Sequence, residues 1–122
     1  MISYEVYKIL HIAGIALLCL GLGAVAASFA SGSPIKPAVK MAGFIGHGLG
    51  LLLILIGGFG MAARLGLVHG LPEWIYAKLG IWLVLGGVVA VAKRKSQWIV
   101  GLFVLFTALV SCAAWIAITK PF

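Results

Sequence analysis

Acidic residues are nearly absent from this chain, which has two glutamates and no aspartate among 122 residues, against nine lysines and arginines. Charged residues make up 9% of the chain and hydrophobic residues 64%. This leaves too little polar surface to cover a soluble domain of this size. The mean hydropathy of +1.24 is likewise too high for a soluble domain. The composition therefore predicts an integral membrane protein with no room for a separate soluble domain.

Several chemical signatures are also missing. Glu5 and Glu73 both lie near the start of an apolar segment, so no intramembrane carboxylate is available for an ion-coupled transporter. Cys19 and Cys112 show no CxxC spacing and should behave as small hydrophobic side chains. Without a CxxCH motif, covalently attached c-type haem is not expected. No basic stripe is interleaved with aromatic residues, so we expect no nucleic-acid partner.

Four long apolar segments predict four transmembrane helices. The breaks between them are "ASGSPIKP", "GLVHGLP" and "KRKSQ", in which proline, glycine and polar residues interrupt the helical pattern. The predicted helices cover residues 4–29, 38–65, 73–92 and 98–119. Because the loops are short, we expect a single all-α domain, an up-down-up-down four-helix bundle surrounded by membrane lipid.

The basic residues also bear on orientation. Five belong to the side of the first and third loops: Lys36, Lys40, Lys93, Arg94 and Lys95. Four belong to the side of the chain termini: Lys8, Arg64, Lys78 and Lys120. The positive-inside rule then places both termini outside.

Two histidines lie inside the predicted helices. His11 is about 10 Å from the terminal side of the first helix, and His47 is about 15 Å from the opposite side of the second. In a hydrocarbon core about 30 Å thick, we expect them at similar depths, where ionisable residues are functional by default. Each histidine could form a hydrogen bond with a neighbouring helix. Each could instead be an axial ligand of the iron of haem b, iron protoporphyrin IX.

Glycines accompany both histidines. Gly14 follows His11 by three residues in "HIAG", and Gly50 follows His47 by three residues in "GFIGHGLG", so each shares a helix face with its histidine. Gly43 lies on the same face as His47. Such glycines usually mark close helix packing in membranes. A flat macrocycle beside histidine needs the same clearance, and we expect Gly14, Gly43 and Gly50 to line a haem site.

Three further residues on the terminal side are candidates for the same site. His69, in the second loop, is either without a role or an additional axial ligand. Arg64 and Lys78 could pair with haem propionates, which favour cationic hydrogen-bond donors. The alternative for Arg64 is a side chain that extends to the membrane interface.

Some segments resemble a known family. "YKILHIAGIAL", "EWIYAKLGIWLVLGG" and the terminal "ITKPF" are similar to HemJ-type protoporphyrinogen oxidases, small four-helix membrane haem proteins of the wider CopD-like group. The resemblance covers about half of the chain. It implies functional roles for His11 and Lys78, a porphyrinogen substrate, and a location in a bacterial inner membrane. His47 has no counterpart in the resemblance and is argued from its own surroundings.

The sequence therefore predicts a membrane protein with haem b ligated by His11 and His47, with His69 as a further candidate. One haem between both ligands would need diagonal helices or a homodimer interface, and separate haems are an alternative. The function would be electron transfer, or oxidation of a porphyrinogen-like or quinol substrate. The other hypotheses are a cofactor-free accessory or transport subunit that packs through its glycines, and a copper-handling protein. Few methionines outside the helices argue against copper.

Overall fold

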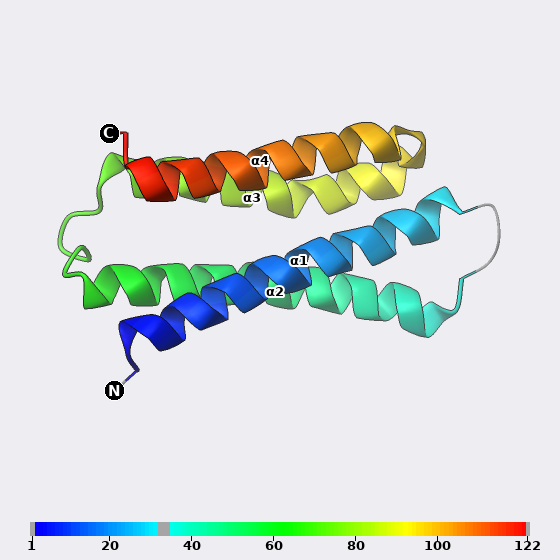
Figure 1. Cartoon of the computed structure of the whole chain (residues 1–122). Helices are drawn as coiled ribbons and strands as arrows, with labels where there is room; N and C mark the ends of the chain where they lie inside the picture. Colours follow the sequence, from blue (N-terminus) through cyan, green and yellow to red (C-terminus); the bar gives the residue numbers. More distant parts are fainter. Residues whose placement is uncertain (1, 32–34, 122) are drawn as a thin grey trace.

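The computed structural model describes residues 2–31 and 35–121 of the chain. Within these ranges the chain forms four long helices, α1 (Tyr4–Ala30), α2 (Pro37–Arg64), α3 (Glu73–Arg94) and α4 (Ile99–Thr119), with a short 3-10 helix, η1 (Ser96–Trp98), before α4. Figure 1 shows that consecutive helices run in opposite directions and that the N- and C-terminal ends lie at the same end of the molecule. The predicted boundaries differ from these by at most two residues.

All four helices are long and apolar enough to cross a membrane, as predicted. Large apolar side chains cover the outside of the molecule, and Val100 and Ile118 are 74% and 82% exposed. Such a surface would be unfavourable in water, and soluble monomers rarely expose large contiguous apolar patches. The helices therefore suit an apolar surrounding.

Local sequence explains where the helices begin and end. The Ser3 hydroxyl accepts a hydrogen bond of 3.3 Å from the backbone N–H of Val6 and caps α1. Pro37 begins α2, where its missing N–H costs no hydrogen bond. Gly66 follows α2 with a φ of 73°, a left-handed conformation that glycine adopts easily. The N–H groups of Gly66 and Leu67 then bond the carbonyls of Ala63 and Ala62, closing the helix end.

Helices α1 and α2 pack with their backbones in direct contact. Glycines recur every seven residues on the two facing surfaces, Gly14 and Gly21 on α1 and Gly43, Gly50 and Gly57 on α2. A Cβ atom added at Gly14 would lie 2.7 Å from the Ile54 nitrogen, and one at Gly50 would lie 2.5 Å from the Leu18 nitrogen. Small residues allow this approach in membrane helices.

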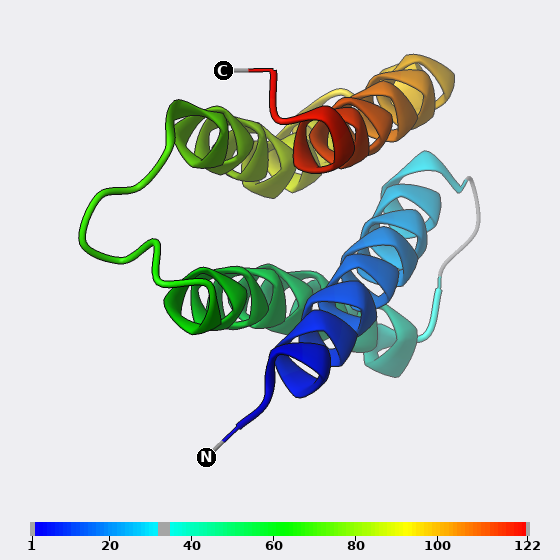
Figure 2. The ribbon, with the colours of Figure 1, turned by 60° about the vertical axis from the view of Figure 1, so that its left-hand side comes forward.

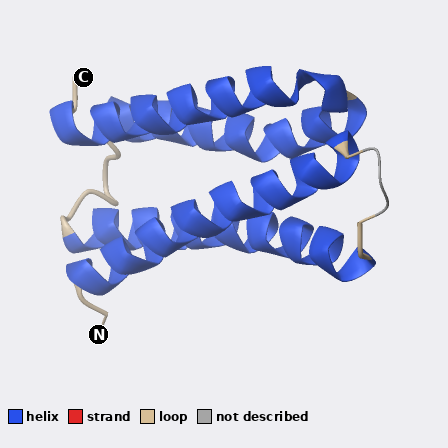
Figure 3. Cartoon of the chain, turned by 45° about the vertical axis from the view of Figure 1, so that its right-hand side comes forward, coloured by secondary structure: helices blue, strands red, loops and turns tan. Residues whose placement is uncertain are grey.

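The α1–α2 pair meets the α3–α4 pair mainly toward the η1 end. A buried cluster there joins three helices: Leu18, Leu22 and Ala26 of α1, Leu85, Val88 and Ala92 of α3, and Leu102 and Phe106 of α4. Toward the opposite end, where both termini lie, α1 diverges from α4 (Figures 1 and 3). Figure 2 shows the same separation of the two pairs from another side. This divergence positions the cavity described next.

Candidate functional site

A cavity of about 620 Å³ lies between the two helix pairs in the half of the molecule that contains the termini. All four helices contribute to its walls, which are mostly aliphatic and aromatic. The exceptions with a charged or strongly polar group are few: Lys8, His11, Lys78 and Lys120. Neither Glu5 nor Glu73 belongs to the described lining. The cavity is therefore apolar in its body and cationic where it has charge.

His11 is held in a defined orientation at the wall of this cavity. Its Nδ1 atom lies 2.8 Å from the carbonyl oxygen of Ile54 on α2. Because a carbonyl oxygen only accepts, Nδ1 must carry the hydrogen and donate it. The lone pair of the imidazole is then on Nε2, which makes this nitrogen the available ligand atom. His11 thus combines a fixed tautomer with a position on the cavity wall.

Three lysines share the cavity with His11. Lys8 precedes His11 by three residues on α1, so both side chains lie on one helix face. Lys78 of α3 is half-buried and lies within electrostatic range of the His11 ring. The ammonium of Lys120, after α4, lies 5.5 Å from the centre of the Trp74 ring. Helices α1 and α3 and the residue that follows α4 therefore bring cations to the same apolar cavity.

His47 is placed differently from His11. It is 4% exposed and lies among α1, α2 and α3, with the carbonyls of Leu18 and Gly86 nearby. Neither of its ring nitrogens reaches a hydrogen-bonding geometry with any partner in the described chain. It is not among the residues that line the His11 cavity. His47 is therefore a buried polar side chain enclosed by helix backbones.

The expectation that the two histidines reach similar depths does not hold. Gly57 of α2 faces His11, because a Cβ added there would lie 2.7 Å from the His11 nitrogen. Gly57 is ten residues beyond His47 on α2, which separates the two histidines by about 15 Å along the helix. The helices, at 27 and 28 residues, are about 40 Å long and exceed the 30 Å core assumed in the estimate. One iron cannot bind both side chains within this chain.

The glycines expected to clear space for a macrocycle face the neighbouring helix instead. Gly14 and Gly50 contact each other's helices, as described above. At Gly43, an added Cβ would lie 3.0 Å from the Ala24 Cβ and 3.1 Å from a methyl group of Val25. The prediction for Gly14, Gly43 and Gly50 is corrected accordingly: the facing helix fills the space that glycine leaves. Helix packing was the alternative, and the structure favours it.

His69 and Arg64 do not line the cavity, although Leu65 and Leu67, close to them in sequence, do. His69 is exposed in the loop between α2 and α3, and Arg64 is an exposed residue at the end of α2. Neither is among the described residues of the cavity wall. Of the eight site residues predicted from the sequence, the structure brings His11 and Lys78 together at one cavity.

The sequence interpretation missed Lys8, Lys120 and Trp82 as cavity residues. The spacing of three between Lys8 and His11 was a visible signal for the first. Trp82 is placed by a hydrogen bond of 3.0 Å from its Nε1 to the Leu51 carbonyl, and Lys120 by the return of α4. The positions of Trp82 and Lys120 depend on contacts between helices that are distant in sequence, so no local sequence pattern predicts them.

In the described ranges, no group of three or more histidine, cysteine or acidic residues is arranged to hold a metal ion. Cys19 and Cys112 are both exposed and unbridged, on outer faces of α1 and α4. A metal held only by protein ligands therefore has no candidate cluster in this part of the chain. A metal that brings most of its own ligands needs fewer protein donors.

Comparison with protein-family models, with curated proteins and with solved structures gives no match for this chain. The functional argument consequently depends on the cavity and its residues.

Proposed function

We propose that this chain is an integral membrane protein that binds haem b in the cavity between its four helices, with His11 as an axial ligand. Haem bound there would serve electron transfer or an oxidoreductase reaction. The observation that carries this proposal is the hydrogen bond from His11 Nδ1 to the Ile54 carbonyl, which leaves Nε2 as the ligand atom at the cavity wall. Metal-binding histidines typically donate their other ring N–H in this way.

The cavity fits such a group in size and surface. Its volume of about 620 Å³ lies within the range of small-molecule sites. Its walls are aliphatic and aromatic, with Trp82, Leu85 and Ile54 among them. A porphyrin supplies four iron ligands of its own, so a single protein imidazole is a sufficient protein contribution. The absence of a three-residue ligand cluster in the described chain therefore does not count against haem.

The lysines supply the charge that a dicarboxylate needs. Lys8, Lys78 and Lys120 all line the cavity, and no glutamate is among its described residues. Carboxylates taken from water into an apolar site are stable only with charge-assisted hydrogen bonds. We assign propionate binding to these lysines, of which only Lys78 was expected from the sequence.

The chain's own residues have distinct tasks in this account. Ile54 orients the imidazole through its backbone carbonyl, the lysines fix the orientation of an anionic amphiphile, and the apolar walls exclude water. Haem, when bound, supplies one-electron redox chemistry. The resemblance to HemJ-type oxidases extends the proposal to a porphyrinogen substrate, with a quinol as the alternative electron donor.

We also propose that the helices cross a bacterial inner membrane in up-down-up-down order, with both termini outside. The opposite directions of successive helices support the order (Figure 1). The orientation follows from the five basic residues at the η1 end against four at the other. The bacterial assignment follows from the family resemblance.

The alternative of a cofactor-free accessory subunit receives no support from the five glycines that lie between α1 and α2. Gly14, Gly21, Gly43, Gly50 and Gly57 contact each other's helices within the chain and are not presented to a partner. Copper handling lacks a ligand cluster in the described residues. Haem binding is therefore the function that the cavity supports best.

The test is a pigment measurement on protein purified in detergent after expression with added haem. We expect a Soret band, a sharp α-band on reduction, and a haem-to-protein ratio near one. If the cavity instead takes another anionic amphiphile, the protein will be folded and colourless, and extraction will recover a lipid or another carboxylate. That result would reject haem as the ligand.

A further inference from the structure

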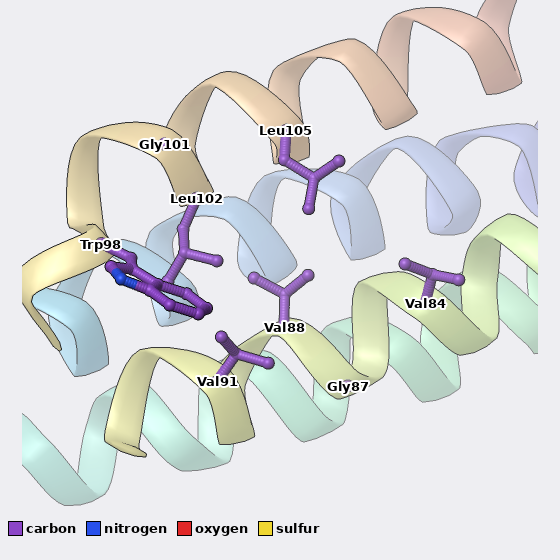
Figure 4. Close-up of a pocket in the computed structure, with 8 residues that line it drawn as sticks. All are labelled: Val84, Gly87, Val88, Val91, Trp98, Gly101, Leu102 and Leu105. Atoms are coloured by element: carbon purple, nitrogen blue, oxygen red, sulfur yellow. The ribbon is translucent and has the colours of Figure 1, made fainter. Parts of the chain in front are cut away.

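A second, smaller cavity lies between α3 and α4, toward the η1 end (Figure 4). It is about 520 Å³, open along one side, and lined only by apolar residues and glycine. Val84, Gly87 and Val91 form its α3 wall, and Trp98, Gly101 and Leu105 its other wall. The His11 cavity is lined by residues within 74–85 of α3 and within 110–120, and it shares no lining residue with this groove.

Two glycines create this groove. A Cβ added at Gly87 or Gly101 would find no atom within 4 Å, so each leaves a gap in its helix surface that no neighbour fills. This is the opposite of Gly14 and Gly50, where the facing helix closes the gap. The groove extends from Val91 to Val84, seven residues or about 10 Å along α3. Its shape is that of a short channel open to the surrounding membrane.

Positive charge gathers at one end of the groove. Lys93, Arg94 and Lys95 begin two residues after Val91 and are all exposed. The Lys95 ammonium lies 5.7 Å from the centre of the Trp98 ring, and Trp98 lines the groove. Both glutamates of the chain lie in the first turns of α1 and α3, at the other end of the molecule. No acidic residue therefore offsets these three cations.

We propose that this groove binds an anionic phospholipid, with one acyl chain between α3 and α4 and the phosphate at Lys93, Arg94 and Lys95. Apolar lining and an adjacent cationic cluster match the two parts of such a lipid. A second copy of the chain is a poorer occupant. Two copies in the same membrane orientation would bring their cationic clusters to the same level, where like charges repel. Lipid binding here does not require haem in the other cavity.

The experiment uses tryptophan fluorescence and brominated lipids. The protein is reconstituted into phosphatidylcholine vesicles that contain a minor share of either dibrominated phosphatidylglycerol or dibrominated phosphatidylcholine. The Trp98 contribution is the difference from Trp98→Phe. We expect brominated phosphatidylglycerol to occupy the site at least about fivefold more readily, the effect of a single engaged cation. High salt should reduce this preference.

Two variants separate the acyl site from the charge site. Replacing Lys93, Arg94 and Lys95 with glutamine should remove the preference for the anionic lipid, while quenching by both lipids continues. Gly87→Leu should fill the groove and lower quenching by both. Gly48→Leu is the matched control, because Gly48 is exposed on α2 and also has no atom within 4 Å of an added Cβ.

Equal quenching by the two brominated lipids in the unmodified protein would overturn the proposal. So would identical quenching in the Gly87→Leu and Gly48→Leu variants. Cross-linked dimers of Gly101→Cys that the unmodified protein does not form, with Trp98 protected from both lipids, would assign the groove to a second copy instead. Circular dichroism confirms that each variant is helical before it is compared.

Discussion

His11 on α1 donates a hydrogen bond of 2.8 Å from Nδ1 to the carbonyl oxygen of Ile54 on α2. This contact joins two helices and fixes which ring nitrogen holds the hydrogen. Gly57 and Gly58 bring α2 close enough for it, since Gly57 faces the His11 backbone and Gly58 its ring. The glycine contact between α1 and α2 therefore positions His11. Gly58 also lines the cavity, whereas Gly57 does not.

The packing role of the glycines predicts a difference between Gly50 and Gly48, two residues apart on α2. Gly50→Ala should lower the free energy of unfolding by about 1–3 kcal/mol, because the added methyl group would meet α1 backbone. Gly48→Ala should leave it unchanged or raise it by up to about 1 kcal/mol through helix propensity. Denaturant titration of the purified protein in detergent measures both.

The variants Gly50→Ala and Gly48→Ala also distinguish a packing role of Gly50 from a role in making room for a ligand. If Gly50 only made room for haem, Gly50→Ala would destabilise the haem-loaded protein and leave the haem-free protein as stable as the Gly48→Ala variant. We expect the loss in both forms, because the α1–α2 contact exists without a ligand.

A second prediction concerns the stability of a variant at His47. This residue is buried, and neither of its ring nitrogens is hydrogen-bonded in the described structure. An unsatisfied buried polar group costs roughly 1–3 kcal/mol. His47→Leu should therefore maintain or raise the free energy of unfolding, and it should leave the haem spectrum unchanged. Thermal unfolding and the Soret band are measured on the same sample. A variant that unfolds more easily and loses its colour would show that His47 binds a group essential to the site.

Lys78 is expected to contribute to haem affinity without ligating the iron. Lys78→Gln should weaken haem binding by about tenfold, the loss of one hydrogen bond to a charged group. Lys78→Arg should recover most of the affinity, and the Soret maximum should stay in place in both. Titration of haem-free protein with haemin gives the dissociation constants. The control is Lys36→Gln, an exposed cation beside the start of α2, far from the cavity. Equal effects of Lys78→Gln and Lys36→Gln would leave Lys78 without this role.

The helices were predictable because their signals are local. Pro37 marks the start of α2, Gly66 lies just beyond its end, and apolar runs between such breaks are long enough to span a membrane. His11 was identified for a similar reason, since an imidazole within an apolar helix is unusual whatever surrounds it.

The relation between the two histidines was not predictable in the same way. It depends on the register of α1 against α2, which Gly21 and Gly57 determine by their contacts with His47 and His11. The seven-residue spacing of the glycines was visible in the sequence and indicates a packing surface. The predicted depths of His11 and His47 were counted from opposite sides of the membrane and did not include this register. They also assumed that helices of about 40 Å match a hydrocarbon core of about 30 Å.

The cavity itself arises from tertiary geometry. Lys120 and Trp82 reach it because α3 and α4 diverge from α1 on one side, and neither residue has a sequence neighbour that signals a site. Lys78 could be identified only through the family resemblance and its depth in the helix.

The most direct measurement of the central claim is the absorption spectrum of two histidine variants purified in parallel after expression with added haem. His11→Ala removes the proposed iron ligand, and His69→Ala removes an exposed imidazole outside the cavity. We predict that His69→Ala retains the Soret band and a haem-to-protein ratio near one. His11→Ala should lose most of the haem, and added imidazole should restore part of the band. Equal haem content in the two variants would contradict ligation by His11.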